Sequence, residues 1–179
     1  MATGRSTQLT RQIGEHLVAA ELGRRGFIAT PFAGNVPNFD LLVANELGVA
    51  IPVQVKAING PSWQFLASTF LDIRVDDGLQ TILGLKDTPN SSLVCVLVLL
   101  RNAGEDEFYT LTFRDLQNHF ASSYKGGRRP KNALSMHCAV WPKDLVAFKG
   151  WGALLSVLRT ASFTSPPTTA SASSSAPDL

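Results

Sequence analysis

One uninterrupted apolar run limits the folds open to this chain more than any other feature. Residues 93–100 read Leu-Val-Cys-Val-Leu-Val-Leu-Leu and contain no polar side chain. The run is too short to cross a bilayer, which takes about 20 residues in a helix. A short segment that is apolar at every position instead predicts a central strand that is covered on both faces.

The sequence around this run alternates between helical and extended patterns. Leu9, Ile13, Leu17 and Ala20 recur at helical spacing, which predicts a first helix over residues 7–24 with these side chains on its apolar face. Strands are then expected at residues 27–31, 39–44, 49–57, 63–65, 70–75, 107–112 and 137–141, and helices at 113–120, from 142 and at 150–159. This order predicts an α/β or α+β fold, with a mixed central β-sheet flanked by helices.

The end of the chain has a different composition. Residues 162–179 read SFTSPPTTASASSSAPDL, mostly Ser, Thr, Ala and Pro. Such a segment buries too little apolar surface to offset the entropy lost on ordering, so we expect a disordered tail. Residues 1–161 remain as a single domain of ordinary size.

The charge balance says little about partners. The chain has 16 basic and 14 acidic residues and a formal net charge of +2, too weak to indicate nucleic-acid binding by itself. One local basic segment contains Lys125, Arg128, Arg129 and Lys131. It is either a substrate-binding patch or a solvated loop.

Cysteine usage and the N-terminus argue against several other classes. Cys95 and Cys138 form neither a CxxC pair nor a zinc pattern, and Cys95 lies within the apolar run as an expected core residue. The first residues contain no apolar core of a signal peptide. We therefore expect a soluble, cytoplasmic protein with no membrane partner.

Three polar residues converge on one expected hairpin. If residues 46–48 form its loop, Asp40 falls opposite Gln54, and Asp40, Gln54 and Lys56 share one face because side chains alternate along a strand. Apolar residues Leu41, Val43, Val53 and Val55 would share the other face. Polar groups on strands that are otherwise buried need partners or a bound metal.

Glu15 adds a second carboxylate. On the first helix it shares a face with Val18, Ala19 and Leu22, opposite the stripe of Ile13 and Leu17. A carboxylate among apolar neighbours is expected to point toward a specific partner.

Together these residues resemble the PD-(D/E)XK nucleases, and the Holliday junction resolvase branch in particular. The resemblance covers roughly residues 12–60. It rests on Gly14-Glu15, Gly26-Phe27, Pro37-Asn38-Phe39-Asp40 and Val53-Gln54-Val55-Lys56-Ala57. The resemblance implies a restriction-endonuclease-like core and metal-dependent hydrolysis of DNA phosphodiester bonds.

The resemblance also implies a role for each residue. Asp40 would be the central ligand of a divalent metal, Mg²⁺ or Mn²⁺, and Glu15 would reach the same ion from the helix. Gln54 and the Val55 backbone carbonyl would complete the ligands. Lys56 would orient the attacking water and stabilise charge on the phosphate.

Two residues depart from simple expectations. Gln54 stands where the motif normally has Asp or Glu, so the site would have two carboxylates and weaker metal affinity in principle. Pro52 lacks a strand donor and predicts a bulge or an unpaired position just before the motif.

Two functions therefore remain open: a metal-dependent endonuclease acting on DNA, and a catalytically weak or inactive module of the same fold that binds nucleic acid or protein. Just past the motif strand, Trp63 and Gln64 are candidates for substrate contact, with core packing the alternative for Trp63. Many proteins of this fold dimerise, which leaves a homodimer open.

Overall fold

The central layer is a five-stranded mixed sheet. The structure is a computed structural model of the 179-residue chain and describes residues 4–32, 39–128, 132 and 134–164. The sheet has the order β1-β2-β3-β7-β8. Its strands are β1 (Ile28–Pro31), β2 (Leu41–Ala44), β3 (Ala50–Ile58), β7 (Val94–Leu99) and β8 (Glu107–Thr112). Neighbours β3 and β7 run parallel and the other pairs are antiparallel, which confirms the expected mixed sheet.

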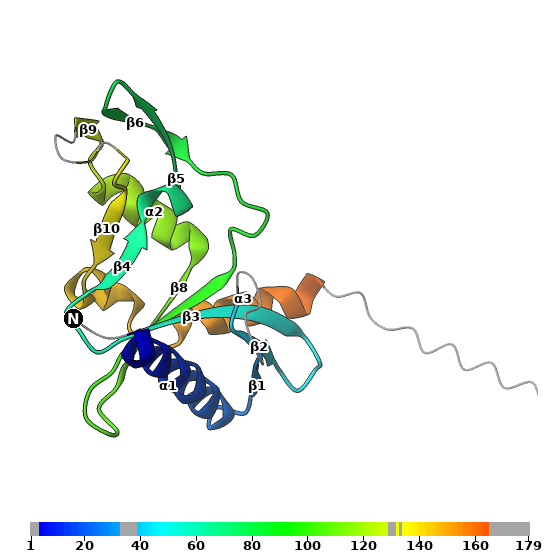
Figure 1. The fold of residues 1–179 in the computed structure, drawn as a ribbon. Coiled ribbons are helices and arrows are strands. Elements are labelled where there is room, and N and C mark those ends of the chain that lie inside the picture. The colour runs from blue at the N-terminus through cyan, green and yellow to red at the C-terminus, as the bar shows by residue number, and fades with distance from the viewer. Residues whose placement is uncertain (1–3, 33–38, 129–131, 133, 165–179) are drawn as a thin grey trace, which may run out of the picture.

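Different elements cover the two faces of this sheet (Figure 1). One face packs against two helices, α1 (Gly4–Gly23) and α3 (Gly152–Thr164). The other face packs against helix α2 and short strands and 3₁₀ segments. These are α2 (Phe113–Ser123), β4 (Trp63–Leu66), β10 (His137–Val140), η1 (Ala67–Thr69) and η2 (Pro142–Phe148). A three-stranded sheet of β5 (Leu71–Asp76), β6 (Leu79–Leu85) and β9 (Gly127–Arg128) lies at the opposite end of the molecule from α1.

Strand β7 belongs to both hydrophobic clusters. Cys95, Leu97 and Leu99 pack into the cluster under α2, β4 and η2. Val94, Val96 and Val98 pack into the cluster under α1 and α3. All six side chains are buried, which confirms the prediction of a strand that is covered on both faces.

The apolar face predicted for α1 is wrong. Leu9 and Ile13 are exposed, by 57% and 40%, whereas Val18 and Leu22 are fully buried against the sheet. The reason is Gly14, on the buried side of the helix. A Cβ at Gly14 would overlap the Cβ of Ala57 on β3, so the absence of a side chain lets the helix approach the sheet closely. The side of α1 that carries Glu15 is therefore the packed side.

Of the two alternatives expected at Pro52, the bulge is wrong, because β2 and β3 pair without a shift and Pro52 lies opposite Leu42, whereas the position is unpaired toward β7. The Asn45 N–H donates to the Val49 carbonyl at 3.0 Å, so every second pair along the hairpin is hydrogen-bonded and Leu42–Pro52 falls between two such pairs. Pro52 also precedes Val53, where the pairing of β3 with β7 begins. The missing N–H of Pro52 therefore removes no hydrogen bond between the strands of the sheet.

Three other segments differ from expectation. Strands β6 and β9 were not predicted, and the short helix expected from Pro142 is present in the 3₁₀ form. Helix α3 continues to Thr164, past the expected start of the tail at Ser162. The Asn45 side-chain amide donates to the Ser162 hydroxyl at 3.1 Å, which ties this part of α3 to the hairpin loop. Within the described ranges, no helix is long and apolar enough to cross a membrane.

Candidate active site

The β2–β3 hairpin has the register expected from its loop length. Leu41 pairs with Val53, and Asp40 immediately precedes this paired segment. The backbone N–H of Asp40 donates to the Val53 carbonyl at 2.8 Å, and the Val55 N–H donates to Asp40 Oδ2 at 2.8 Å. The Asp40 carboxylate is thus fixed on β3 beside Gln54 and Lys56.

These residues line a cleft of about 640 Å³. Asp40, Gln54 and Lys56 all contribute to its wall. The Val55 side chain is buried in the cluster on the opposite face, so this residue reaches the cleft through its backbone. Much of the remaining wall is aromatic: Phe39, Phe65, Phe70 and Phe113.

Arg11 joins the two carboxylates of the site. Its Nε donates to Glu15 Oε1 at 2.7 Å, and its Nη2 donates to Asp40 Oδ1 at 2.8 Å. Both acidic side chains are nearly buried, at 12% exposure for Glu15 and 10% for Asp40, while Arg11 is 47% exposed. The hydrogen bond to Glu15, together with the charge of both carboxylates, raises the pKa of Arg11. Arg11 therefore links Glu15, on the helix, to Asp40, beside the motif strand.

The Lys56 side chain packs over the aromatic ring of Phe65. Its ammonium is 4.4 Å from the centre of the Phe65 ring, a cation–π arrangement. Burial lowers the pKa of Lys56, and the nearby Cys138 opposes that change. This contact places the long side chain at the wall of the cleft.

Buried groups on neighbouring strands support the motif. The Trp63 indole N–H donates to the Lys56 carbonyl at 2.9 Å, and the Trp63 side chain is fully buried, so it packs in the core beneath the strand. Gln64 on the same strand is exposed and lines the cleft. The Cys95 thiol lies 3.9 Å from Gln54 Oε1 as a weak donor, and burial raises the pKa of Cys95 to about 12, which keeps it protonated.

The donors gathered here suit a hard cation. Two carboxylates, an amide oxygen and a backbone carbonyl are oxygen donors of the kind that Mg²⁺ or Mn²⁺ accepts, while zinc sites in proteins rely on Cys and His. Among the residues that the structure describes, no group of three or more His, Cys, Asp or Glu side chains is placed to hold a metal. The oxygen donors of Asp40, Gln54 and Val55 line the cleft and would suit a divalent ion with few charged ligands, and Glu15 lies outside that lining.

The basic segment lies elsewhere. Arg128, on β9, is exposed and forms an ion pair with Asp77 at 3.5 Å. Lys125 is also exposed, and neither residue lines the cleft. Strand β9 lies at the end of the molecule remote from α1 (Figure 1). Arg129 and Lys131 lie outside the described residues.

Reasoning from the sequence missed Arg11, Phe65 and His137 as part of the cleft wall. A signal for Arg11 was present, because it precedes Glu15 by four positions, the spacing at which helical side chains form ion pairs. No local signal marks Phe65, because its role depends on β4 packing beside the motif strand.

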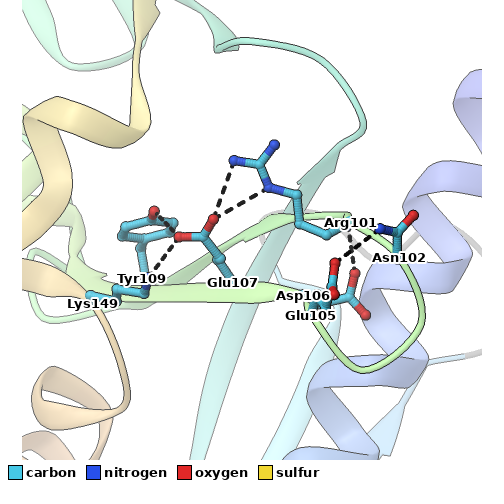
Figure 2. Close-up of polar contacts among 7 residues, drawn as sticks. All are labelled: Arg101, Asn102, Glu105, Asp106, Glu107, Tyr109 and Lys149. Atoms are coloured by element: carbon cyan, nitrogen blue, oxygen red, sulfur yellow. Dashed lines mark hydrogen bonds and ion pairs between the residues drawn. The ribbon is translucent and has the colours of Figure 1, made fainter.

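A second polar cluster lies where β8 begins (Figure 2). Glu107 Oε2 accepts hydrogen bonds from Lys149 Nζ and the Tyr109 hydroxyl, both at 2.8 Å, while Oε1 accepts from Arg101 Nη2 at 3.2 Å. Lys149 contributes most to lowering the pKa of Glu107 to about 2. Burial and the bond to Glu107 raise the pKa of Tyr109 to about 12.

Comparison with known proteins defines the class of fold. No family model matches this chain, and no curated protein matches it in sequence. The fold is nevertheless similar to that of a nuclease. The particular neighbour is a bacterial homing endonuclease, I-Ssp6803I, with a TM-score of 0.50 and 12% identity over 89% of this chain and 97% of that chain. At this identity the likeness establishes the mixed α+β fold alone.

Proposed function

We propose that the protein is an endonuclease of the PD-(D/E)XK type that hydrolyses DNA phosphodiester bonds with a divalent metal. One observation carries the proposal: Asp40, Gln54 and Lys56 line a single cleft, and Arg11 ties the Glu15 carboxylate to the same point. The nuclease-like fold supports it.

The residues divide the chemistry among them. Asp40 and Glu15 would hold Mg²⁺ or Mn²⁺, with the Gln54 amide oxygen and the Val55 carbonyl as neutral ligands. When bound, the ion lowers the pKa of water and polarises the phosphoryl oxygen. Lys56 orients the attacking water and offsets the charge that develops on the phosphate. Its contact with the Phe65 ring positions the ammonium for this role.

The test is DNA cleavage in the presence of Mn²⁺ or Mg²⁺, assayed on duplex, single-stranded and branched substrates. Lys56→Met keeps the apolar stem over Phe65 but removes the ammonium. Asp40→Asn keeps an oxygen that can accept the Val55 N–H but removes the charge. Both variants should lose about 10²–10³-fold in rate with unchanged circular dichroism.

Lys143→Met is the matched control, because Lys143 lies beside Trp141 and does not line the cleft. This variant should cleave like wild type. Cleavage that survives both Lys56→Met and Asp40→Asn would refute the proposed site.

The balance of charges at the candidate site favours a second function, that of a binding module without catalysis. Arg11 and protonated Lys56 match the two negative charges of Glu15 and Asp40 without a metal. A module of this fold that binds nucleic acid or protein without catalysis would have such a balanced site. Calorimetric titration with Mn²⁺ distinguishes the two functions, since equal absence of heat from wild type and Asp40→Asn would favour the binding module.

A further inference from the structure

A single guanidinium bonds to Asp40, which lines the cleft, and to Glu15, which does not. The nitrogens that bond to Glu15 and Asp40 belong to the same planar group, at 2.7 Å and 2.8 Å. In the structure, Arg11 thus offsets the repulsion between two carboxylates that are each about nine-tenths buried.

We propose that Arg11 is the resident counter-cation of the metal-free site, gives way when a divalent ion binds, and then contacts the DNA phosphate. The inference rests on the proposed function, because it names how that site is regulated. It assigns Arg11 two opposing effects: it weakens metal binding and strengthens DNA binding.

The position of Arg11 allows this exchange. Its side chain is 47% exposed and lines the cleft, and it lies one helical turn from Glu15 on α1. A long side chain at the mouth of a cleft can leave Asp40 by rotating about its own bonds, without moving the helix. Arginine also binds phosphate through the same planar fork that it offers a carboxylate.

An ordinary surface pair at the C-terminal end of α1 provides the contrast. Arg24 bonds to Glu21 at 3.0 Å with 79% of its side chain exposed, and it does not line the cleft. Such exposed pairs contribute little to stability and are screened by salt. Arg24→Gln is therefore the matched control for Arg11→Gln, because each removes one guanidinium that pairs with a glutamate of α1.

The first measurement is calorimetric titration of Mn²⁺ into the metal-free full-length chain, as wild type, Arg11→Gln, Arg11→Lys and Arg24→Gln. Removing a positive charge next to the ion should tighten Mn²⁺ binding about tenfold in Arg11→Gln. Arg11→Lys keeps the charge without the fork and should fall between Arg11→Gln and wild type. Arg24→Gln should match wild type.

The second measurement is binding of a short fluorescent DNA duplex at saturating Ca²⁺, repeated over a range of salt concentrations. Arg11→Gln should bind DNA about fivefold more weakly, with the slope of log K against log salt reduced by about one, as expected when one phosphate contact is lost. A structural role for Arg11 would instead weaken both metal and DNA binding, and that result would overturn the inference.

The outcomes separate this inference from the proposed function. Equal Mn²⁺ affinity in wild type and Arg11→Gln would overturn the role of Arg11 and leave the metal-dependent nuclease standing. Mn²⁺ binding by Arg11→Gln alone would support the role of Arg11 and count against metal use by wild type. Absence of binding in both would overturn the two together. If Arg11→Gln does not fold, as judged by circular dichroism, Arg11→Lys decides by the same criteria.

Discussion

Two polar clusters in this molecule hold carboxylates against arginine, and they do so in opposite ways. In the cluster at the start of β8 (Figure 2), one carboxylate, Glu107, receives hydrogen bonds from three side chains: Arg101, Tyr109 and Lys149. In the cleft, two carboxylates share the guanidinium of one arginine, Arg11.

The difference distinguishes a structural cluster from a site built for exchange. The single negative charge of Glu107 is surrounded by three hydrogen-bond donors. The bond from Lys149 joins β8 to the segment that follows η2. Glu15 and Asp40 share the single guanidinium of Arg11, and of the two carboxylates Asp40 lines the cleft. Two carboxylates that share one guanidinium leave room for a cation to replace it, whereas Glu107 already pairs with two cations, Arg101 and Lys149.

The strongest test of this comparison removes one negative charge from each cluster. Glu15→Gln should lower the rate of metal-dependent DNA cleavage about 10–100-fold, because it removes a charged ligand but leaves Asp40 and Lys56 in place. Glu107→Gln should keep the rate within about twofold of wild type. Cleavage rates at saturating Mn²⁺ provide the measurement, and equal losses in the two variants would show that the comparison is mistaken.

A smaller effect is expected where α1 approaches the sheet. Gly14→Ala places a methyl against Ala57 Cβ, so it should destabilise the protein by about 1–3 kcal/mol and move Glu15 away from Asp40. Gly23→Ala is the control, since a Cβ there meets nothing within 4 Å. Urea denaturation measures the change, and Gly14→Ala stability equal to that of Gly23→Ala would contradict the close approach.

The smallest expected effect is the loss at acidic pH of the stability that Glu107 contributes. The pKa of Glu107 is lowered from 4.5 to about 2 on folding, so its contribution to stability is present above about pH 4.5 and is lost as the pH falls toward 2. Glu107→Gln should therefore cost about 1 kcal/mol near pH 6 and less near pH 3. Urea denaturation at both pH values tests this, and a cost that does not change with pH would assign the effect to hydrogen bonding without charge.

The candidate hairpin was predictable because its constraints are local. A three-residue loop after Asn45 fixes the register, and the register decides which side chains share a face. The alternation of Val53 and Val55 with Gln54 and Lys56 then separates core from cleft. No knowledge of the remaining chain was needed for that step.

The features that the sequence did not reveal depend on distant segments. Two arcs of α1 carry apolar residues, and only the contact between Gly14 and Ala57 determines that Val18 packs while Leu9 stays exposed. Strand β6 has weak alternation of its own and is held by pairing with β5 and β9. The link between Arg11 and Asp40 spans 29 positions, beyond any helical spacing rule.

The double burial of β7 has a consequence for how the molecule opens. Because Val96 and Leu97 belong to different hydrophobic clusters, neither layer can separate from the sheet without exposing one face of the same strand. Local opening should therefore spare β7, and its backbone amides should exchange with solvent deuterium only when the whole molecule unfolds. The motif strand β3 pairs with β7 from Val53 to Ile58, so it should share this protection from exchange. Gln54 and Lys56 therefore belong to the part of the molecule that is expected to open last.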